Sequence, residues 1–295
     1  MNDAAWPALP LEGWKDTYAT LHLWNQIIGK IALAQAPPLN HSWAVAFHLT
    51  PRGWSTVMLP HGNRTFTIEF DFVDHQLWIR TCDGDAQSIP LAPQPVAEFY
   101  ARVMTRLRDL GLPVKIWPVT VEMPAAIRLD RDLAHHTYSP EAANRFWRLL
   151  TSIVHVFNAS RTDFVGKASP AHFFWGSFDL ALTRFSGRLA PPREGPAFMR
   201  EAYSHEVISH GFWPGSDPVN EPAFYAYAAP EPDGLKDVRP RPDAAYYHRQ
   251  LGEFILPYEA VRTSPSPEEA IRDFISSTYD AAARLARWDR AALER

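Results

Sequence analysis

The stretch GKASPAHFFWGSFDLALTRFSG, residues 166–187, gathers aromatic, charged and metal-capable side chains in one strand-like run. We predict a central β-strand here, in which residues two positions apart share a face. Asp179 lies among apolar neighbours in this run, where an ionised carboxylate is costly unless it is paired. The stretch therefore holds either a functional site or a carboxylate paired with a base such as Arg184 or Lys167.

Helices and strands are predicted on both sides of this stretch. The run FTIEFDF at residues 66–72 alternates apolar and polar side chains, which indicates a half-buried strand. Apolar stripes and capping residues predict helices at residues 16–28 (ended by Gly29), 95–110, 139–157 and 266–285. Further strands are predicted at residues 43–49, 55–59, 76–81, 114–122, 203–212, 223–228 and 254–258.

These elements predict an α+β fold with two lobes, each a mostly antiparallel sheet with packed helices. A polar, proline-containing connection at residues 123–138 places the boundary between an N-terminal lobe, 1–125, and a C-terminal lobe, 126–295. Short strings also match between the halves, such as IGK at residues 28–30 and VGK at residues 165–167. The match leaves open whether the lobes arose by duplication or resemble each other by chance.

Composition narrows the classes of function. The net charge of −4 and the absence of a Lys/Arg stripe argue against nucleic acid and anionic membranes as partners. No apolar run is long enough to span a membrane and no secretory signal is evident, so we expect a cytoplasmic protein. The single Cys82 excludes an internal disulfide framework. The 11 Trp residues favour either thick sheet packing or an aromatic-lined pocket for a flat or apolar ligand.

A second polar cluster, SHEVISH at residues 204–210, follows the central stretch. It resembles the H-E-x-x-H zinc-peptidase motif, which needs two histidines four residues apart on a helix. Here His205 and His210 are five residues apart, so their rings diverge on a helix and point to opposite faces of a strand. The cluster is therefore not a peptidase motif.

Four residues from the two clusters form the predicted catalytic set: His172, Asp179, His205 and Glu206. They are interpreted as metal ligands or as acids and bases, and the metal alternative assigns His172, His205 and Asp179 to a divalent zinc, iron or manganese ion. The other interpretation is structural, with these residues forming hydrogen bonds and an ion pair inside a sheet.

The predicted substrate-binding residues are Lys167, Trp175, Arg184 and Tyr203. Lys167 and Arg184 are expected to hold an anionic group. We expect an enzyme that acts on a small aromatic or anionic organic molecule in an aromatic-lined cleft. The alternatives are a non-catalytic protein that binds or senses a small molecule and a module that binds a partner through exposed aromatic residues.

Three strings also resemble a known family: WPALPLEGWKDTYATLHLW at residues 6–24, HFFWGSFDLALTRFSGRLAPP at 172–192 and SHEVISHGFWPG at 204–215. Together they resemble an uncharacterised bacterial family, described as a domain of unknown function. The resemblance spans nearly the whole chain and implies a free-standing, cytoplasmic bacterial protein. It assigns no activity, cofactor or functional residue.

Overall fold

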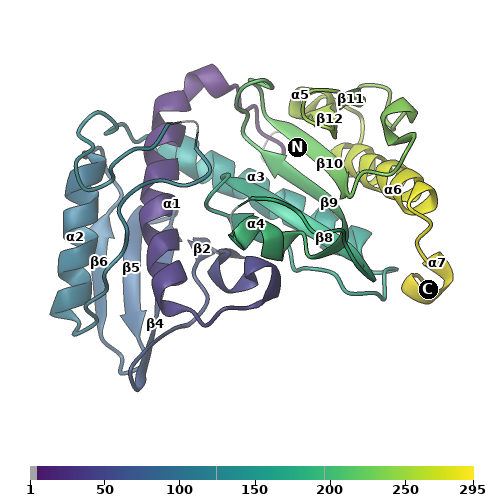
Figure 1. Ribbon diagram of the computed structural model, residues 1–295. Helices are drawn as coiled ribbons and strands as arrows, with labels where there is room; N and C mark the ends of the chain where they lie inside the picture. The colour runs from purple at the N-terminus through teal and green to yellow at the C-terminus, as the bar shows by residue number, and fades with distance from the viewer. Residues whose placement is uncertain (1–4, 124, 196) are drawn as a thin grey trace. The chain divides into compact units, whose positions relative to one another are not determined.

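The computed structural model describes residues 5–123, 125–195 and 197–295 (Figure 1). It contains helices and two antiparallel sheets, which confirms the α+β class. The chain divides into two compact units. The first unit holds Glu12–Arg148 and Phe173–Asp179. The second unit holds the described residues up to Leu11, Leu149–His172 and Leu180–Arg295.

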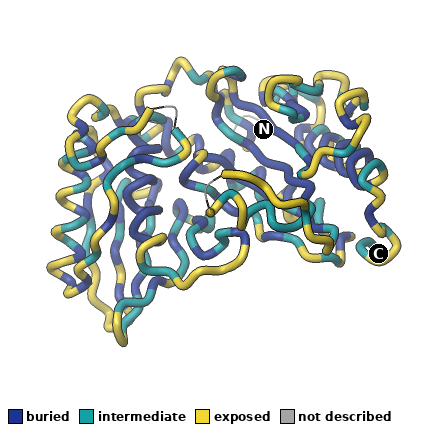
Figure 2. Tube along the Cα trace, in the orientation of Figure 1, coloured by how far each residue is buried: buried dark blue, intermediate teal, exposed yellow. Residues whose placement is uncertain are grey.

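The sheet of the first unit is an antiparallel meander with the strand order β1-β2-β4-β5-β6, and β3 also pairs with β4. Its strands are β1 (His48–Thr50), β2 (Gly53–Ser55), β3 (Leu59–His61), β4 (Arg64–Asp71), β5 (Gln76–Thr81) and β6 (Ala86–Pro90). The alternating strand predicted at residues 66–72 is β4, whose Phe66, Ile68 and Phe70 are buried. Buried residues run along β4 and β5, drawn dark blue in Figure 2.

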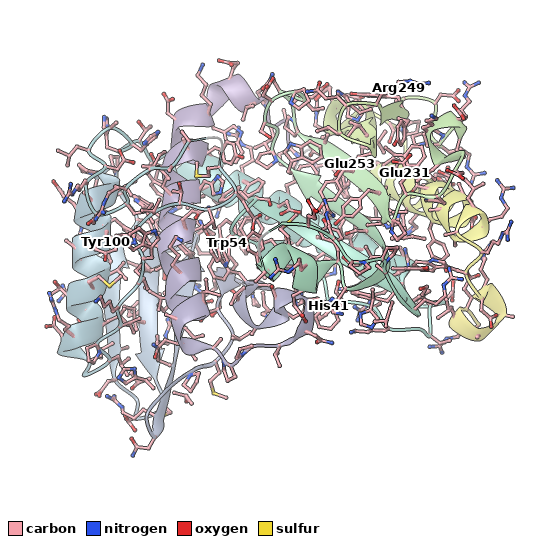
Figure 3. The ribbon with its side chains drawn as sticks, in the orientation of Figure 1. His41, Trp54, Tyr100, Glu231, Arg249 and Glu253 are labelled. Carbon is pink, nitrogen blue, oxygen red and sulfur yellow. The ribbon has the colours of Figure 1, made fainter. Side chains whose placement is uncertain are left out.

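Two long helices pack in this unit, α1 (Lys15–Gln35) and α2 (Val96–Asp109). Trp24 of α1 stacks on Phe99 of α2, with ring centroids 4.5 Å apart. Trp54, labelled in Figure 3, donates its indole N–H to Asn25 Oδ1 at 2.8 Å and stacks on Phe173 at 4.6 Å. This aromatic packing accounts for part of the high tryptophan content.

Four predictions in the first unit are wrong in whole or in part. The strand predicted at residues 55–59 is instead the last residue of β2 and the first residue of β3, with residues 56–58 outside any strand. The helix predicted to end at Gly29 continues to Gln35, because Gly29 is needed inside the helix for contact with Trp175. The strand predicted at residues 43–49 is only partly present: residues 43–45 belong to the 3₁₀ segment η2 (Asn40–Val45), where His41 has the positive φ of 58°, whereas residues 48–49 begin β1. Residues 114–122, predicted as a strand, contain one isolated bridge, between Val119 and Arg128.

The sheet of the second unit has the order β11-β12-β10-β9-β8, and the short β7 (His172–Phe174) follows β8 at its edge. The chain leaves this unit after His172, the first residue of β7. The other strands are β8 (Asp179–Leu189), β9 (His205–Trp213), β10 (Ala223–Ala229), β11 (Tyr246–His248) and β12 (Glu253–Pro257).

Helices cover one face of this sheet. The helical segments are α3 (Pro140–Ser160), α4 (Ala197–Ala202), α5 (Tyr258–Arg262), α6 (Pro267–Leu285) and α7 (Arg290–Leu293), with the 3₁₀ turns η1 (Leu11–Gly13) and η3 (Leu235–Asp237) elsewhere in the chain. Figure 1 shows α6 beside β9 and β10, where His210 contacts Thr278. Phe157 of α3 lies 6.4 Å from Phe224 of β10, so α3 packs on the same face.

The central stretch is not one strand. It forms β7 and β8, separated by a turn at residues 175–178 in which Phe178 has the positive φ of 59°. The sequence-based assignment missed this turn because WGSF contains a single glycine within an aromatic run. The helices predicted from Ser139 and from Ser266 are confirmed as α3 and α6.

One of the boundaries between the compact units falls between Arg148 and Leu149, inside α3. The division into lobes 1–125 and 126–295 stays a prediction about folding domains. The duplication is not confirmed, since residues 28–30 lie inside α1 whereas residues 165–167 lie outside any helix. None of the helices in the described ranges is both long enough and apolar enough to cross a membrane.

Candidate functional site

Strand register shows where the predicted catalytic residues lie. Leu180 of β8 pairs with Phe212 of β9, and Leu189 pairs with His205. Asp179 directly precedes Leu180, so it lies at the opposite end of the β8–β9 ladder from His205. Nine strand residues separate the two ends by about 30 Å. The sheet therefore does not bring Asp179 and His205 together around one ligand.

Glu206 is held in an ion pair on β9. Its Oε2 accepts hydrogen bonds from Arg188 at 2.7 Å and from Ser186 Oγ at 2.9 Å. The carboxylate also lines a small cavity of about 150 Å³, together with Glu231 and Trp288. Glu231, labelled in Figure 3, accepts a hydrogen bond from the Tyr247 hydroxyl at 2.7 Å.

The histidines of the second cluster lie on opposite faces of β9, as their spacing predicts. His205 Nδ1 lies 3.1 Å from Ser204 Oγ, whereas the buried His210 contacts Thr278 Oγ1 at 3.0 Å. His172, the third predicted histidine, is 2% exposed at the start of β7. Among the described residues, no three His, Cys, Asp or Glu side chains are arranged to hold a metal ion.

Two of the predicted substrate-binding residues take part in packing contacts. Trp175 is buried, and its indole N–H donates to the carbonyl of Val45 at 3.0 Å. The Tyr203 hydroxyl lies 3.1 Å from that of Tyr227, and the guanidinium of Arg193 lies 4.5 Å above the Tyr203 ring. Their predicted role in binding substrate stays a prediction.

A second cavity lies at the C-terminal end of α3. Its volume is about 720 Å³. We call it the α3 pocket; it is lined by Asn158, Arg161, Thr162, Phe164, Gly166, Ala168 and Arg295. The final residues of the chain close one side, because Val165 N–H donates to Leu293 O and Arg295 N–H donates to Asp163 O.

The pocket wall is basic and partly aromatic. Arg161 donates to the backbone carbonyl of Ser169. Within the described residues, neither Arg161 nor Arg295 forms an ion pair with an Asp or Glu side chain. Phe164 contributes an apolar ring to the same wall. This combination suits a molecule with a negatively charged group and a flat or apolar portion.

A third arginine lies directly behind this wall. Arg184 is 3% exposed, and its guanidinium lies 5.8 Å from the Phe164 ring and 4.8 Å from the Tyr279 ring. Its Nη2 donates to the carbonyl of Ser160 at 2.7 Å, while Nε and Nη1 have no hydrogen-bond acceptor. Burial lowers the pKa of Arg184, and the nearby Tyr279 and Glu294 partly offset this effect.

Lys167, predicted to act with Arg184, does not line the pocket. Its ammonium lies 4.9 Å above the ring of Phe185, although its neighbours Gly166 and Ala168 both line the wall. The sequence therefore identified one of the basic residues at this place, Arg184, and did not identify the two that face the cavity.

A different polar arrangement supports the turn at residues 175–178 in the first unit. From α1, His22 Nε2–H donates to Gly176 O at 2.9 Å, and Gln26 Nε2 donates to Val121 O at 2.8 Å. Ser177 Oγ then donates to Glu122 Oε2 at 2.6 Å. Burial lowers the pKa of His22 to about 4, although hydrogen bonds to backbone groups of Gly176 and Trp175 oppose this shift.

Comparison with known proteins gives one match. A family model described as a family of unknown function, DUF5996, matches residues 6–295. The chain belongs to this family. No curated protein and no solved structure shows a significant match to the chain. Membership in DUF5996 confirms the resemblance noted from the sequence and assigns no activity.

In this DUF5996 protein, Arg161 and Arg295 are the pocket residues that sequence reasoning missed. Arg161 directly follows α3 and lies in no periodic or motif pattern that would mark it as a binding residue. Arg295 is 134 positions further along the chain, and its arrival at the pocket depends on the pairing of residues 293–295 with residues 163–166. No local sequence pattern encodes that pairing.

Proposed function

We propose that the protein binds a small organic anion in the α3 pocket. The observation that carries the proposal is the pair of arginines, Arg161 and Arg295, that line a cavity of about 720 Å³ without a carboxylate partner among the described residues. Arginine is well suited to carboxylates and phosphates because its planar fork can donate two parallel hydrogen bonds.

The rest of the wall limits the kind of ligand. A volume of this size is in the range of small-molecule sites, which is about 300–1,000 Å³. Phe164 offers an apolar contact, and Asn158 and Thr162 offer polar groups. An anion with an attached ring or short apolar portion would use all three kinds of contact.

The sequence leaves two classes of protein open, an enzyme and a non-catalytic protein that binds or senses a small molecule. Proteins of both classes must bind a small molecule. The enzyme class and a cytoplasmic location remain proposals beside this binding. The predicted catalytic residues do not line the α3 pocket. We therefore propose binding as the function of this pocket and assign no reaction to it.

Isothermal titration calorimetry with phenyl phosphate tests the proposal, because this probe joins an anionic group to a flat ring. We expect saturable binding to the wild-type protein at one site. Arg161→Gln removes one charge from the pocket wall and should weaken binding at least tenfold, a loss of about 1.4 kcal/mol.

Arg239→Gln is the matched control, since Arg239 is highly exposed, does not line the pocket and undergoes the same change of charge. It should leave the affinity unchanged. Absence of binding to the wild type would refute the proposal, and so would an equal loss of affinity in both variants.

A further inference from the structure

Arg184 is an unusual residue for a protein interior. A buried charge normally has an opposite charge or a full set of hydrogen bonds, because leaving water is otherwise costly. Arg184 makes one hydrogen bond, to Ser160 O, and two of its guanidinium nitrogens have no acceptor. Such groups are rare in native structures and call for an explanation.

Nearby carboxylates do not provide that explanation. The carboxylate of Glu294 interacts electrostatically with Arg184, but its Oε1 accepts hydrogen bonds from Arg290 at 2.6 Å and from the Tyr279 hydroxyl at 2.7 Å. The rings of Tyr279 and Phe164 offer cation–π contacts, which compensate only part of the lost hydration.

Positive charge instead accumulates around this wall of the cavity. Arg161 and Arg295 line the cavity, and the buried guanidinium of Arg184 lies 5.8 Å from the ring of Phe164, which also lines it. Arg161 is close enough to Arg184 for their charges to repel. Ala168, which lines the cavity, pairs with Arg184 in the sheet, so the third charge is fixed next to the wall by backbone hydrogen bonding.

We propose that Arg184 makes the α3 pocket selective for doubly charged anions, such as a phosphate monoester, over singly charged ones of the same shape. This inference rests on the proposed binding function. The buried guanidinium acts on the ligand through a thin layer of protein, where charges interact more strongly than they do across water. A ligand with two negative charges would balance the excess positive charge that the empty pocket carries.

Phenyl phosphate and phenyl sulfate are suitable matched probes. At pH 8 the phosphate carries two negative charges and the sulfate carries one, while both present a tetrahedral anion on the same ring. Calorimetry at matched ionic strength should give a wild-type affinity for phenyl phosphate about tenfold higher than for phenyl sulfate.

The variant Arg184→Met removes the buried charge and keeps an apolar chain of similar length. We expect phenyl sulfate affinity to fall about fivefold and phenyl phosphate affinity to fall by about the square of that factor, because each charge on the ligand loses its attraction to Arg184. The ratio of the two affinities should therefore fall from about tenfold to about twofold. A role of Arg184 limited to supporting the fold would move both affinities together and leave their ratio at the wild-type value.

Arg184→Lys keeps the charge, so it should preserve most of the wild-type ratio of phenyl phosphate affinity to phenyl sulfate affinity. This variant still tests the role of the charge if Arg184→Met does not fold. The inference is wrong if the wild type binds both probes equally or if Arg184→Met keeps the wild-type ratio. Equal binding of both probes would leave the proposed anion-binding function standing. Failure of both probes to bind would overturn the function and the inference together.

Discussion

Gly29 of α1 and Trp175 lie in contact so close that a Cβ atom on Gly29 would be 2.0 Å from the indole ring. The glycine therefore occupies the middle of a 21-residue helix for a packing reason. Glycine in a helix interior destabilises the helix by about 1 kcal/mol relative to alanine. Here the absence of a side chain on Gly29 lets the buried Trp175 ring approach the helix backbone.

Gly29→Ala should destabilise the first unit by about 2 kcal/mol, because overpacking against the indole exceeds the gain in helix propensity. Urea unfolding measures the change. In a Trp175→Ala background the clash is absent, so the same substitution should stabilise the protein by up to about 1 kcal/mol. A destabilising effect of equal size in both backgrounds would show that Trp175 is not the cause.

Two helix N-termini allow a test of capping. Ser139 Oγ accepts a hydrogen bond from Ala142 N–H at 3.2 Å at the start of α3, whereas Ser266 makes no side-chain capping bond at the start of α6. Ser139→Ala should therefore cost about 1 kcal/mol and Ser266→Ala only a few tenths. Thermal unfolding of the two variants compares them directly, and equal losses would contradict the assignment.

These elements show what local sequence can predict in this fold. β4, β5, α2, α3 and α6 have strong periodic patterns or clear starts, and the structure confirms them. Ser266 makes no side-chain capping bond, although the predicted helix and the proline at its start are present. Gly29 was predicted to end the helix because glycine often follows the last helical residue. The sequence alone does not distinguish that role from a glycine inside a helix that makes room for a side chain from elsewhere in the chain.

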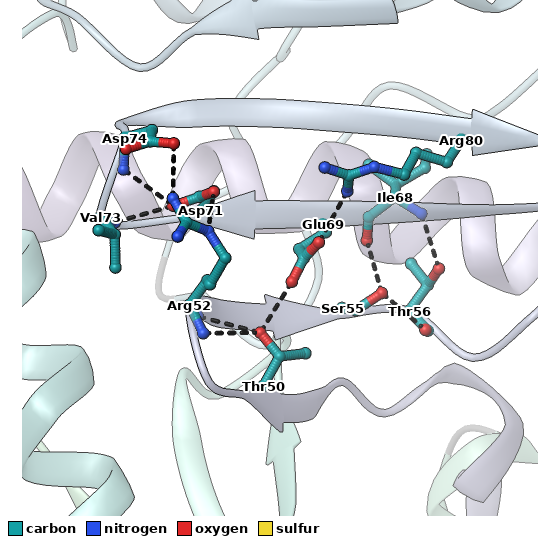
Figure 4. Close-up of polar contacts among 11 residues, drawn as sticks. Thr50, Arg52, Ser55, Thr56, Ile68, Glu69, Asp71, Val73, Asp74 and Arg80 are labelled. Atoms are coloured by element: carbon teal, nitrogen blue, oxygen red, sulfur yellow. Dashed lines mark hydrogen bonds and ion pairs between the residues drawn. The ribbon is translucent and has the colours of Figure 1, made fainter. Parts of the chain in front are cut away.

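Arg52 connects a buried and an exposed carboxylate, as Figure 4 shows. Its guanidinium lies 2.6 Å from Asp71 Oδ2 and 2.6 Å from Asp74 Oδ2, and only Asp71 is buried. Burial raises the pKa of Asp71, but the hydrogen bonds from Arg52 and from the backbone N–H groups of Asp74 and Val73 outweigh it, so the net shift is downward.

Asp71→Asn should cost about 2 kcal/mol of stability at pH 7, because a charged hydrogen bond is lost in a buried place. Asp74→Asn is the matched control and should change stability by less than about 0.5 kcal/mol, as is usual for an exposed ion pair. Because the folded pKa of Asp71 is depressed, the difference between wild type and Asp71→Asn should shrink as the pH falls below 4. Urea titrations at pH 7 and pH 3 measure this.

The candidate site was less predictable than the fold. Arg184 was identified as a candidate partner for Asp179, whose carboxylate lies among apolar neighbours in the sequence, and this is a local argument. Arg161 and Arg295 reach the same pocket through long-range pairing, and the sequence contains no pattern for it. Asp179 and His205 were predicted to act together because both are titratable residues in two stretches that lie close in sequence, but strand register separates them.

His22 provides a test of the buried polar contacts beneath the turn at residues 175–178. Its folded pKa of about 4 is lower than the ordinary value of 6.5, because burial disfavours the charged ring. Below pH 6.5 the unfolded chain therefore takes up a proton that the folded protein does not, and stability falls with pH down to about 4. A shift of this size corresponds to about 3 kcal/mol.

His22→Gln removes the titrating group and keeps a side chain able to donate to Gly176 O. The stability difference between wild type and this variant should decrease by about 3 kcal/mol between pH 7 and pH 4, measured by urea unfolding. A pH-independent difference for His22→Gln would mean that the ring becomes charged in the folded protein, and the contact with the Gly176 carbonyl would then have to stabilise the cation.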